Sequence, residues 1–348
     1  MLVGGARAVL FGKTPKLRVF DILMDFEHQS YRGVLPTGLT DSRGQNTATN
    51  VTWIDPPGMT KQVYATNTLR IRSGTILDGL MVDIGPKVNS LASTTPTGGT
   101  NVDVAVTAGS SYTLWINAEA NGSAALTATT ATISGTGSAT HGSPFYFSCT
   151  VSGNVNVAFT GTIYLPQLEN TPYPTSYINS GGANRGNDDI SFNTFPISDI
   201  TQPYTIMAEI TYLSPDLLNQ NPAVAIDVDD GSNNNRLSVF RRVTLGQQLA
   251  RSVNSTNATE DGDLGLDLWP AVARGRIIAG TKSGEQNECF NGGAVNKGHI
   301  AMPLALTTAR IGRGFQATAA HAGSAIVHKV GIAFRYLSDS DIKYHSTL

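Results

Sequence analysis

Apolar and polar residues alternate along much of the chain with the period of two that is typical of β-strands. The clearest stretch is NVDVAV, where Val102, Val104 and Val106 fall on one face. Similar stretches recur about every ten residues up to residue 168, which is the spacing of a β-sandwich. The pattern continues after residue 187, and a helical period is not evident in these parts. It predicts an all-β protein with two antiparallel β-sandwiches.

One helix is predicted, at the C-terminal end, over residues 337–346 (LSDSDIKYHS). Ser338 is placed as its N-cap, because a serine side chain can accept a hydrogen bond from the first turn. Asp341 stands three residues further on, in the position of a capping box.

A domain boundary is indicated between Leu165 and Asp189, where a nearly uncharged, Thr-rich stretch gives way to a more charged one. Pro172 and Pro174 favour an extended path, and Gly181-Gly182 forms a free joint. We therefore expect four parts, which are an N-terminal arm at 1–20, a first sandwich at 21–178, a linker at 179–186 and a second sandwich at 187–348.

Composition removes several classes of function. The net charge is -2 and 14% of the 348 residues are charged, which argues against a nucleic-acid partner. No apolar run approaches the roughly 20 residues of a membrane span, so membrane insertion is not expected. Cys149 and Cys289 lie on opposite sides of the boundary and are expected to be two buried thiols.

The first 20 residues are basic, since no acidic residue precedes Asp21. They lack the apolar core of a signal peptide. We interpret them as an anchoring arm that docks on a neighbouring subunit, with docking on its own domain as the alternative. The side chains expected to carry that contact are Arg7, Lys13, Lys16 and Arg18.

The densest cluster of oxygen ligands is DVDDGSNNN, residues 227–235. Asp227, Asp229 and Asp230 could bind Ca²⁺, which takes several oxygen ligands, but the glutamate that closes an EF-hand loop is missing. The favoured alternative is a hairpin turn in which Gly and Asn adopt positive φ angles. We therefore expect no cofactor, with calcium as the alternative.

Trp269 precedes Pro270 and is the best candidate for an exposed aromatic that stacks on a sugar, although partial burial is the favoured alternative. The predicted glycan-binding set is Trp269 with Asp229, Asn233 and Asn235.

The sequence contains no recognisable catalytic motif, because G-x-S-x-G and a Gly-rich phosphate loop are absent. Four glutamates could pair for glycoside hydrolysis, but no spacing singles out a pair. They are Glu169, Glu209, Glu285 and Glu288. We expect a protein that is not an enzyme.

Several stretches resemble a known family when they are taken in order. QLENTPYPTSYI (167–178) resembles the QLE…TSYI signature that closes a jelly-roll module in bacteriophage structural proteins, and DFEHQSYRGVLPTGLT (25–40) resembles its start. GIAFRYLSDSDI (331–342) and DDGSNNNRLSVF (229–240) resemble the concanavalin A-like (LamG-like) sandwich that follows it. The chain departs from this pattern in its short Thr-rich first module and at Ile342.

The resemblance implies a virion component such as a fibre, decoration protein or adhesin, assembled in the host cytoplasm. Its jelly-roll module would span 21–178 and its concanavalin A-like sandwich 187–348. The arm would bind other virion proteins, and the chain would form a homo-oligomer, with a trimer favoured. The alternative is a lectin that recognises a host-surface glycan, and a polysaccharide-degrading enzyme is a third interpretation.

Overall fold

A computed structural model describes most of the second half of the chain and parts of the first half. The described residues are 19–28, 30–33, 40–41, 50–54, 61–65, 71–72, 79–84, 87–91, 96, 98–141, 143–171, 184–185, 190–193, 203–212, 223–232, 235–244, 247–256, 259–264, 267–269, 273–299, 301–303, 305–312 and 323–348.

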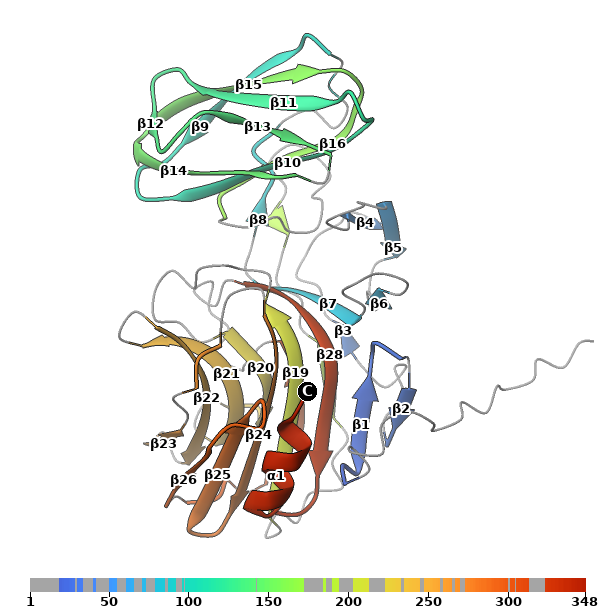
Figure 1. The fold of residues 1–348 in the computed structure, drawn as a ribbon, viewed down its shortest axis with the longest axis vertical. Helices are drawn as coiled ribbons and strands as arrows, with labels where there is room; N and C mark the ends of the chain where they lie inside the picture. The colour runs from blue at the N-terminus through green and yellow to red at the C-terminus, as the bar shows by residue number, and fades with distance from the viewer. Residues whose placement is uncertain are drawn as a thin grey trace, which may run out of the picture.

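The protein is all-β, as predicted, and its larger sandwich consists of a nine-stranded and a seven-stranded antiparallel sheet (Figure 1). In the nine-stranded sheet the path is β2-β1-β28-β19-β24-β25-β26, with β7 also on β28 and β6 on β7. Its strands are β1 (Ile22–Asp25), β2 (Ser30–Arg32), β6 (Ile71–Arg72), β7 (Gly79–Ile84), β19 (Tyr204–Tyr212), β24 (Arg274–Lys282), β25 (Glu285–Phe290), β26 (Val295–Gly298) and β28 (Gly323–Ala333).

The seven-stranded sheet follows the order β23-β22-β21-β20-β27-β18-β3. Its strands are β3 (Thr40–Asp41), β18 (Ile190–Asn193), β20 (Ala223–Asp229), β21 (Arg236–Thr244), β22 (Gln247–Thr256), β23 (Thr259–Leu264) and β27 (Thr308–Ile311). A separate hairpin pairs β4 (Asn50–Ile54) with β5 (Lys61–Ala65).

The main core lies between these two sheets. Ile206, Ala208 and Ile210 of β19 point inward and pack in one buried cluster with Val228 and Leu237 of the facing sheet. All nine residues of β19 are nevertheless buried. The outer face of this central strand is therefore covered as well.

The cover on the outer face includes the C-terminal helix α1 (Asp339–Ser346). Its predicted cap is confirmed, because the Ser338 side chain accepts a hydrogen bond from the Asp341 N–H. No other helix is found in the described residues, and none there is long and apolar enough to span a membrane.

A second apolar cluster joins α1 to the outer face of the sheet. Leu337 and Ile342 pack against Met207 of β19 and Ile278 of β24. Phe20, from the segment before β1, belongs to the same cluster. Both ends of the described chain are thus held on one face of one sheet.

The smaller sandwich consists of two four-stranded sheets, β12-β14-β10-β16 and β13-β11-β15-β9. Each consecutive strand changes sheet, and the core between the sheets is continuous. The strands are β9 (Asn101–Val106), β10 (Ser111–Ala118), β11 (Ser123–Ala128), β12 (Thr132–Ile133), β13 (Gly137–Thr140), β14 (Phe145–Val151), β15 (Gly153–Thr160) and β16 (Ile163–Glu169). The predicted face of β9 is confirmed, because Val104 and Val106 are buried in this core with Val102 packed against it.

The sheets do not follow the predicted division of the chain at residues 178 and 187. The strands β1 and β7 both pair with β28, so the first part of the chain completes the larger sandwich. The smaller sandwich is an insertion, because the strands on either side of it, β8 (Lys87–Val88) and β17 (Asn184–Arg185), pair with each other. Figure 1 shows it as a separate lobe beyond β8.

Removing the insertion should leave a folded larger sandwich. Val88 and Asn184 are direct cross-strand partners, so a two-residue Asn-Gly turn can join them in place of residues 89–183. We expect the shortened protein to unfold in one cooperative thermal transition with a β-type circular dichroism spectrum. An aggregated or unstructured product would contradict the assignment of 89–183 as an insertion.

Candidate functional site

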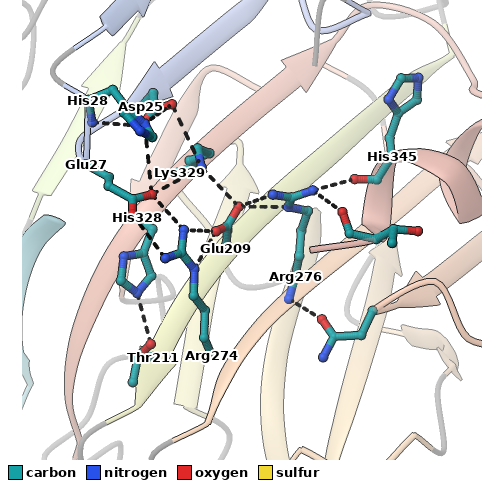
Figure 2. A network of polar contacts seen from close by, with 12 residues as sticks. Asp25, Glu27, His28, Glu209, Thr211, Arg274, Arg276, His328, Lys329 and His345 are labelled. Atoms are coloured by element: carbon teal, nitrogen blue, oxygen red, sulfur yellow. Dashed lines mark hydrogen bonds and ion pairs between the residues drawn. The ribbon is translucent and has the colours of Figure 1, made fainter. Parts of the chain in front are cut away.

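A network of charged side chains lies on the outer face of the nine-stranded sheet, and Glu209 is its centre (Figure 2). Glu209 is 1% exposed and points away from the main core, because Ala208 and Ile210 point into it. Its Oε2 accepts a hydrogen bond from Nε of Arg276 at 2.8 Å, and its Oε1 accepts one from Nε of Arg274 at 2.6 Å.

Strand register explains how these groups meet. Arg276 is the direct partner of Glu209 on β24, and Arg274 lies two residues away on the same face. On the other side, β28 has a bulge opposite Glu209. Because of this irregularity, the consecutive residues His328 and Lys329 both lie on the outer face, where Nε2 of His328 lies 2.9 Å from the hydroxyl of Thr211. Nζ of Lys329 lies 3.6 Å from Oε2 of Glu209.

The network ties both ends of the described chain to the centre of the sheet. In the turn after β1, Glu27 accepts two hydrogen bonds from Arg274, at 2.7 and 3.2 Å. At the end of α1, Arg276 donates to the carbonyl oxygens of His345 and Thr347, at 3.1 and 2.5 Å. Cationic donors at a helix C-terminus satisfy carbonyls that have no partner within the helix.

Glu27 and Glu209 are held in the ionised form. The hydrogen bond from Arg274 is the largest influence on Glu27 and lowers its pKa to about 2. Burial raises the pKa of Glu209, but Arg276, Lys329 and Arg274 outweigh burial, and the net shift is downward. A general acid for glycoside hydrolysis needs a raised pKa, so neither glutamate suits that role.

Asp25, Glu27 and His28 form a group whose ligand atoms are close enough to share a metal ion, and it is the one such group found in the described residues. Nδ1 of His28 lies 3.0 Å from Asp25 and 4.0 Å from Glu27. However, the ammonium of Lys329 already lies 3.3 Å from Glu27 and 3.9 Å from Asp25. The two carboxylates therefore already have a cation.

An open pocket of about 610 Å³ lies at the tip of the β24–β25 hairpin and the end of β26. It is lined by Ser283, Gly284, Glu285, Lys297, Gly298 and His299. Glu285 and Lys297 face each other there, with Nζ 3.7 Å from Oε1. Their side chains are 33% and 53% exposed, so both polar heads can be reached from solvent.

Residues outside the pocket lining hold these two heads in place. The hydroxyl of Tyr336 donates to Glu285 at 2.6 Å, and Nζ of Lys282 lies 3.0 Å from the other carboxylate oxygen. Nζ of Lys297 lies 2.6 Å from Asp339, the first residue of α1. The pocket is thus fixed by both the hairpin and the helix.

The residues predicted to bind calcium do not gather into one group of carboxylates. Asp229 forms an ion pair with Arg310 at 2.8 Å. Asp227 is buried and accepts a hydrogen bond from the hydroxyl of Ser238 at 2.5 Å. The side chain of Asp230 is bonded within the turn, to the N–H of Ser232. Residues 233 and 234 lie outside the described residues. The hairpin-turn alternative is confirmed, because these residues connect β20 to β21 and Gly231 has φ +86°.

Trp269 is not an exposed platform, and that prediction is wrong. Its side chain is fully buried against Tyr212 and Phe290, with ring centroids 5.1 and 4.9 Å away. Its indole N–H donates to the carbonyl of Ala273 at 3.1 Å. Of its predicted partners, Asp229 is buried, Asn235 is bonded to Asp230 and Asn233 lies outside the described residues.

The other predicted sites have mixed outcomes. The arm residues Arg7, Lys13, Lys16 and Arg18 lie outside the described residues. Glu169 is buried in the smaller sandwich, where it accepts a hydrogen bond from the indole of Trp115 at 2.8 Å.

Glu209 was predicted only as one of four glutamates that could pair for hydrolysis, and its place at the centre of the network was not predicted, although the sequence carries a signal for it. Glu209 is the one charged residue in the strand YTIMAEITY, and a lone charge in a buried strand needs a partner. The pocket had no such signal, because Glu285 and Lys297 meet only through strand pairing.

Comparison with known protein families and with curated proteins found no match. Among solved structures, the binding domain of botulinum neurotoxin DC in complex with SialylT is 13% identical, with a TM-score of 0.36 over 45% of this chain and 38% of that chain. The Ruminococcus gnavus IT-sialidase CBM40 bound to α2,3 sialyllactose is 11% identical, with a TM-score of 0.34 over 42% of this chain and 83% of that chain. The match to the neurotoxin binding domain spans about two fifths of that chain. Similarity at this level assigns no function.

Replacing Glu209 with glutamine should lower the free energy of unfolding by about 3–5 kcal/mol, because it leaves buried cations without their central counterion. Chemical denaturation measures the change. Asp103→Asn, at an exposed position in the smaller sandwich, keeps the Oδ1 that accepts from Asn156, so it is the matched control and should change it by less than about 0.5 kcal/mol. Equal effects of the two substitutions would contradict the central role of Glu209.

Acid should weaken the fold through Glu27. Its pKa is lowered from 4.5 to about 2, so its stabilising contribution is complete above pH 4.5 and disappears as the pH falls towards 2. The variant Glu27→Gln should be less stable than the wild type at pH 7 and should lose less further stability over this interval. Thermal unfolding at a series of pH values measures this, and parallel curves for the two proteins would refute it.

Proposed function

We propose that this chain is a non-catalytic recognition protein that binds a saccharide in the pocket at the β24–β25 hairpin. The observation that carries the proposal is the solvent-accessible pair of Glu285 and Lys297, each held by groups outside the pocket. Saccharides are bound through arrays of hydroxyl groups, which need fixed donors and acceptors at an accessible surface.

Rigidity of the support favours this role. The pocket sits on the paired strands β24, β25 and β26, and not on a long loop. Asp339 of α1 orients Lys297, and α1 is itself packed on the sheet through Leu337 and Ile342. Binding groups fixed before the ligand arrives lose less conformational entropy on binding.

The absence of catalysis is part of the proposal. Glu285 has a lowered pKa, with the hydrogen bond from Tyr336 as the largest cause. A carboxyl group that stays ionised cannot protonate a leaving group, and it serves better as a hydrogen-bond acceptor.

The resemblance of several stretches to a known family indicates where the protein would act. The stretches 167–178 and 331–342 resemble those of bacteriophage fibre and adhesin proteins, so we propose that the chain is displayed on a virion and attaches it to a host-surface glycan. Its N-terminal arm would bind other virion proteins.

A glycan array probed with the full chain tests the proposal. We expect the wild type to bind, and we expect Lys297→Met and His299→Ala to bind at least tenfold more weakly. Both side chains are exposed, so their replacement should change stability by only about 0–1 kcal/mol.

The matched control is Lys343→Met, which removes an exposed lysine of α1 that is not part of the pocket lining. It should bind as the wild type does. Failure of the wild type to bind any glycan would refute the proposed function, and release of reducing ends from a bound polysaccharide would refute the non-catalytic role.

A further inference from the structure

The groups that line the pocket indicate which class of saccharide it binds, and this inference rests on the function proposed above. We propose that Glu285 and Lys297 together bind two adjacent hydroxyl groups of a neutral sugar ring, one hydroxyl donating to the carboxylate and its neighbour accepting from the ammonium.

Glu285 and Lys297 both have hydrogen-bonding capacity that their partners in the protein do not use. A carboxylate has about four lone-pair sites, and Glu285 uses two of them, for the hydroxyl of Tyr336 at 2.6 Å and the ammonium of Lys282 at 3.0 Å. An ammonium has three N–H donors, and Lys297 directs one at Asp339 at 2.6 Å. Its 3.7 Å contact with Glu285 is an ion pair and is too long for a hydrogen bond. Acceptor and donor capacity therefore remain side by side.

The distance between the two groups suits a pair of neighbouring hydroxyls. A hydroxyl oxygen lies about 2.8 Å from an acceptor or donor with which it forms a hydrogen bond. A carboxylate oxygen and an ammonium nitrogen 3.7 Å apart can each take one of two neighbouring ring hydroxyls. A single isolated hydroxyl would use only one of the two groups.

The net charge of the side chains around the pocket favours an uncharged ligand. Lys282 and Lys297 are balanced by Glu285 and Asp339, so these four groups have a formal sum of zero. The carboxylate or sulfate of an acidic sugar bound to Lys297 would also lie close to Glu285, because the two side chains are 3.7 Å apart, and the ammonium of an amino sugar bound to Glu285 would lie close to Lys297. Like charges at this distance oppose binding, which favours a neutral sugar.

The protonation states agree with these roles. Hydrogen bonding from Lys297 lowers the pKa of Asp339, and the same bond raises the pKa of Lys297. Burial, followed by the bond to Glu285, raises the pKa of Tyr336, so its hydroxyl stays a donor. The acceptor and the donor offered to a sugar therefore do not change near neutral pH.

The test uses the full chain on an array of terminal galactosides, glucosides and mannosides, together with their sialylated and sulfated forms. We expect binding to neutral termini, and at least tenfold weaker binding to the acidic forms and to neutral termini whose adjacent diols have been cleaved by periodate. Unchanged binding after periodate, or a preference for the acidic forms, would overturn the ligand assignment while leaving saccharide recognition in place. No binding to any terminus would overturn both.

Deoxy sugars give a second measurement that does not depend on ring opening. Methyl glycosides of the bound hexose that lack one hydroxyl are titrated against the full chain by NMR. Loss of either member of one adjacent pair should weaken binding about tenfold or more, whereas loss of a hydroxyl outside the pair should change it less than threefold. Equal effects at every position would refute the paired contact.

The variant Glu285→Gln separates the acceptor role from shape. It keeps the size of the side chain and loses the charge, so we expect at least tenfold weaker binding of the methyl hexoside, with Lys343→Met unchanged. Wild-type affinity in Glu285→Gln would overturn the role of the carboxylate.

Discussion

The structure depends on one buried carboxylate, that of Glu209, in the middle of the central strand β19. A charge in that position is costly unless it is paired and hydrogen-bonded. Here it is shared by Arg274, Arg276 and Lys329, which come from the strands on both sides. The outer face of the sheet is therefore organised around Glu209 in the way that the inner face is organised around apolar packing.

This pairing reaches the candidate site through the C-terminal helix. Arg276 binds carbonyls at the end of α1, and Asp339 at its start binds Lys297 of the pocket. The helix thus connects the buried network to the exposed pair of Glu285 and Lys297. The position of α1, and with it that of Lys297 in the proposed binding site, therefore depends partly on the contacts of Arg276 in the buried network.

Local sequence pattern predicted the local features well. The alternation in β9, the cap at Ser338 and the hairpin turn at Gly231 depend only on neighbouring residues, and all three are found. The domain boundaries failed because strand pairing is long-range. Nothing around Ile22 indicates that its partner is Ile332, more than 300 residues later.

The candidate sites show the same limit. Trp269 was predicted to be exposed because Pro270 follows it, but its burial depends on Tyr212 of β19 and Phe290 of β25. The bulge that places both His328 and Lys329 on the outer face cannot be recognised from the sequence of β28, because all the described side chains of that strand are buried. Sites whose side chains come from separate strands could be identified only from the three-dimensional structure.

The most direct test of the central claim is an NMR map of the full, isotope-labelled chain with the neutral glycan that it binds best on an array. The account predicts chemical-shift changes concentrated at Ser283–Glu285 and Lys297–His299, with smaller changes at the start of α1. Changes confined to the smaller sandwich or to the β20–β21 turn would contradict it.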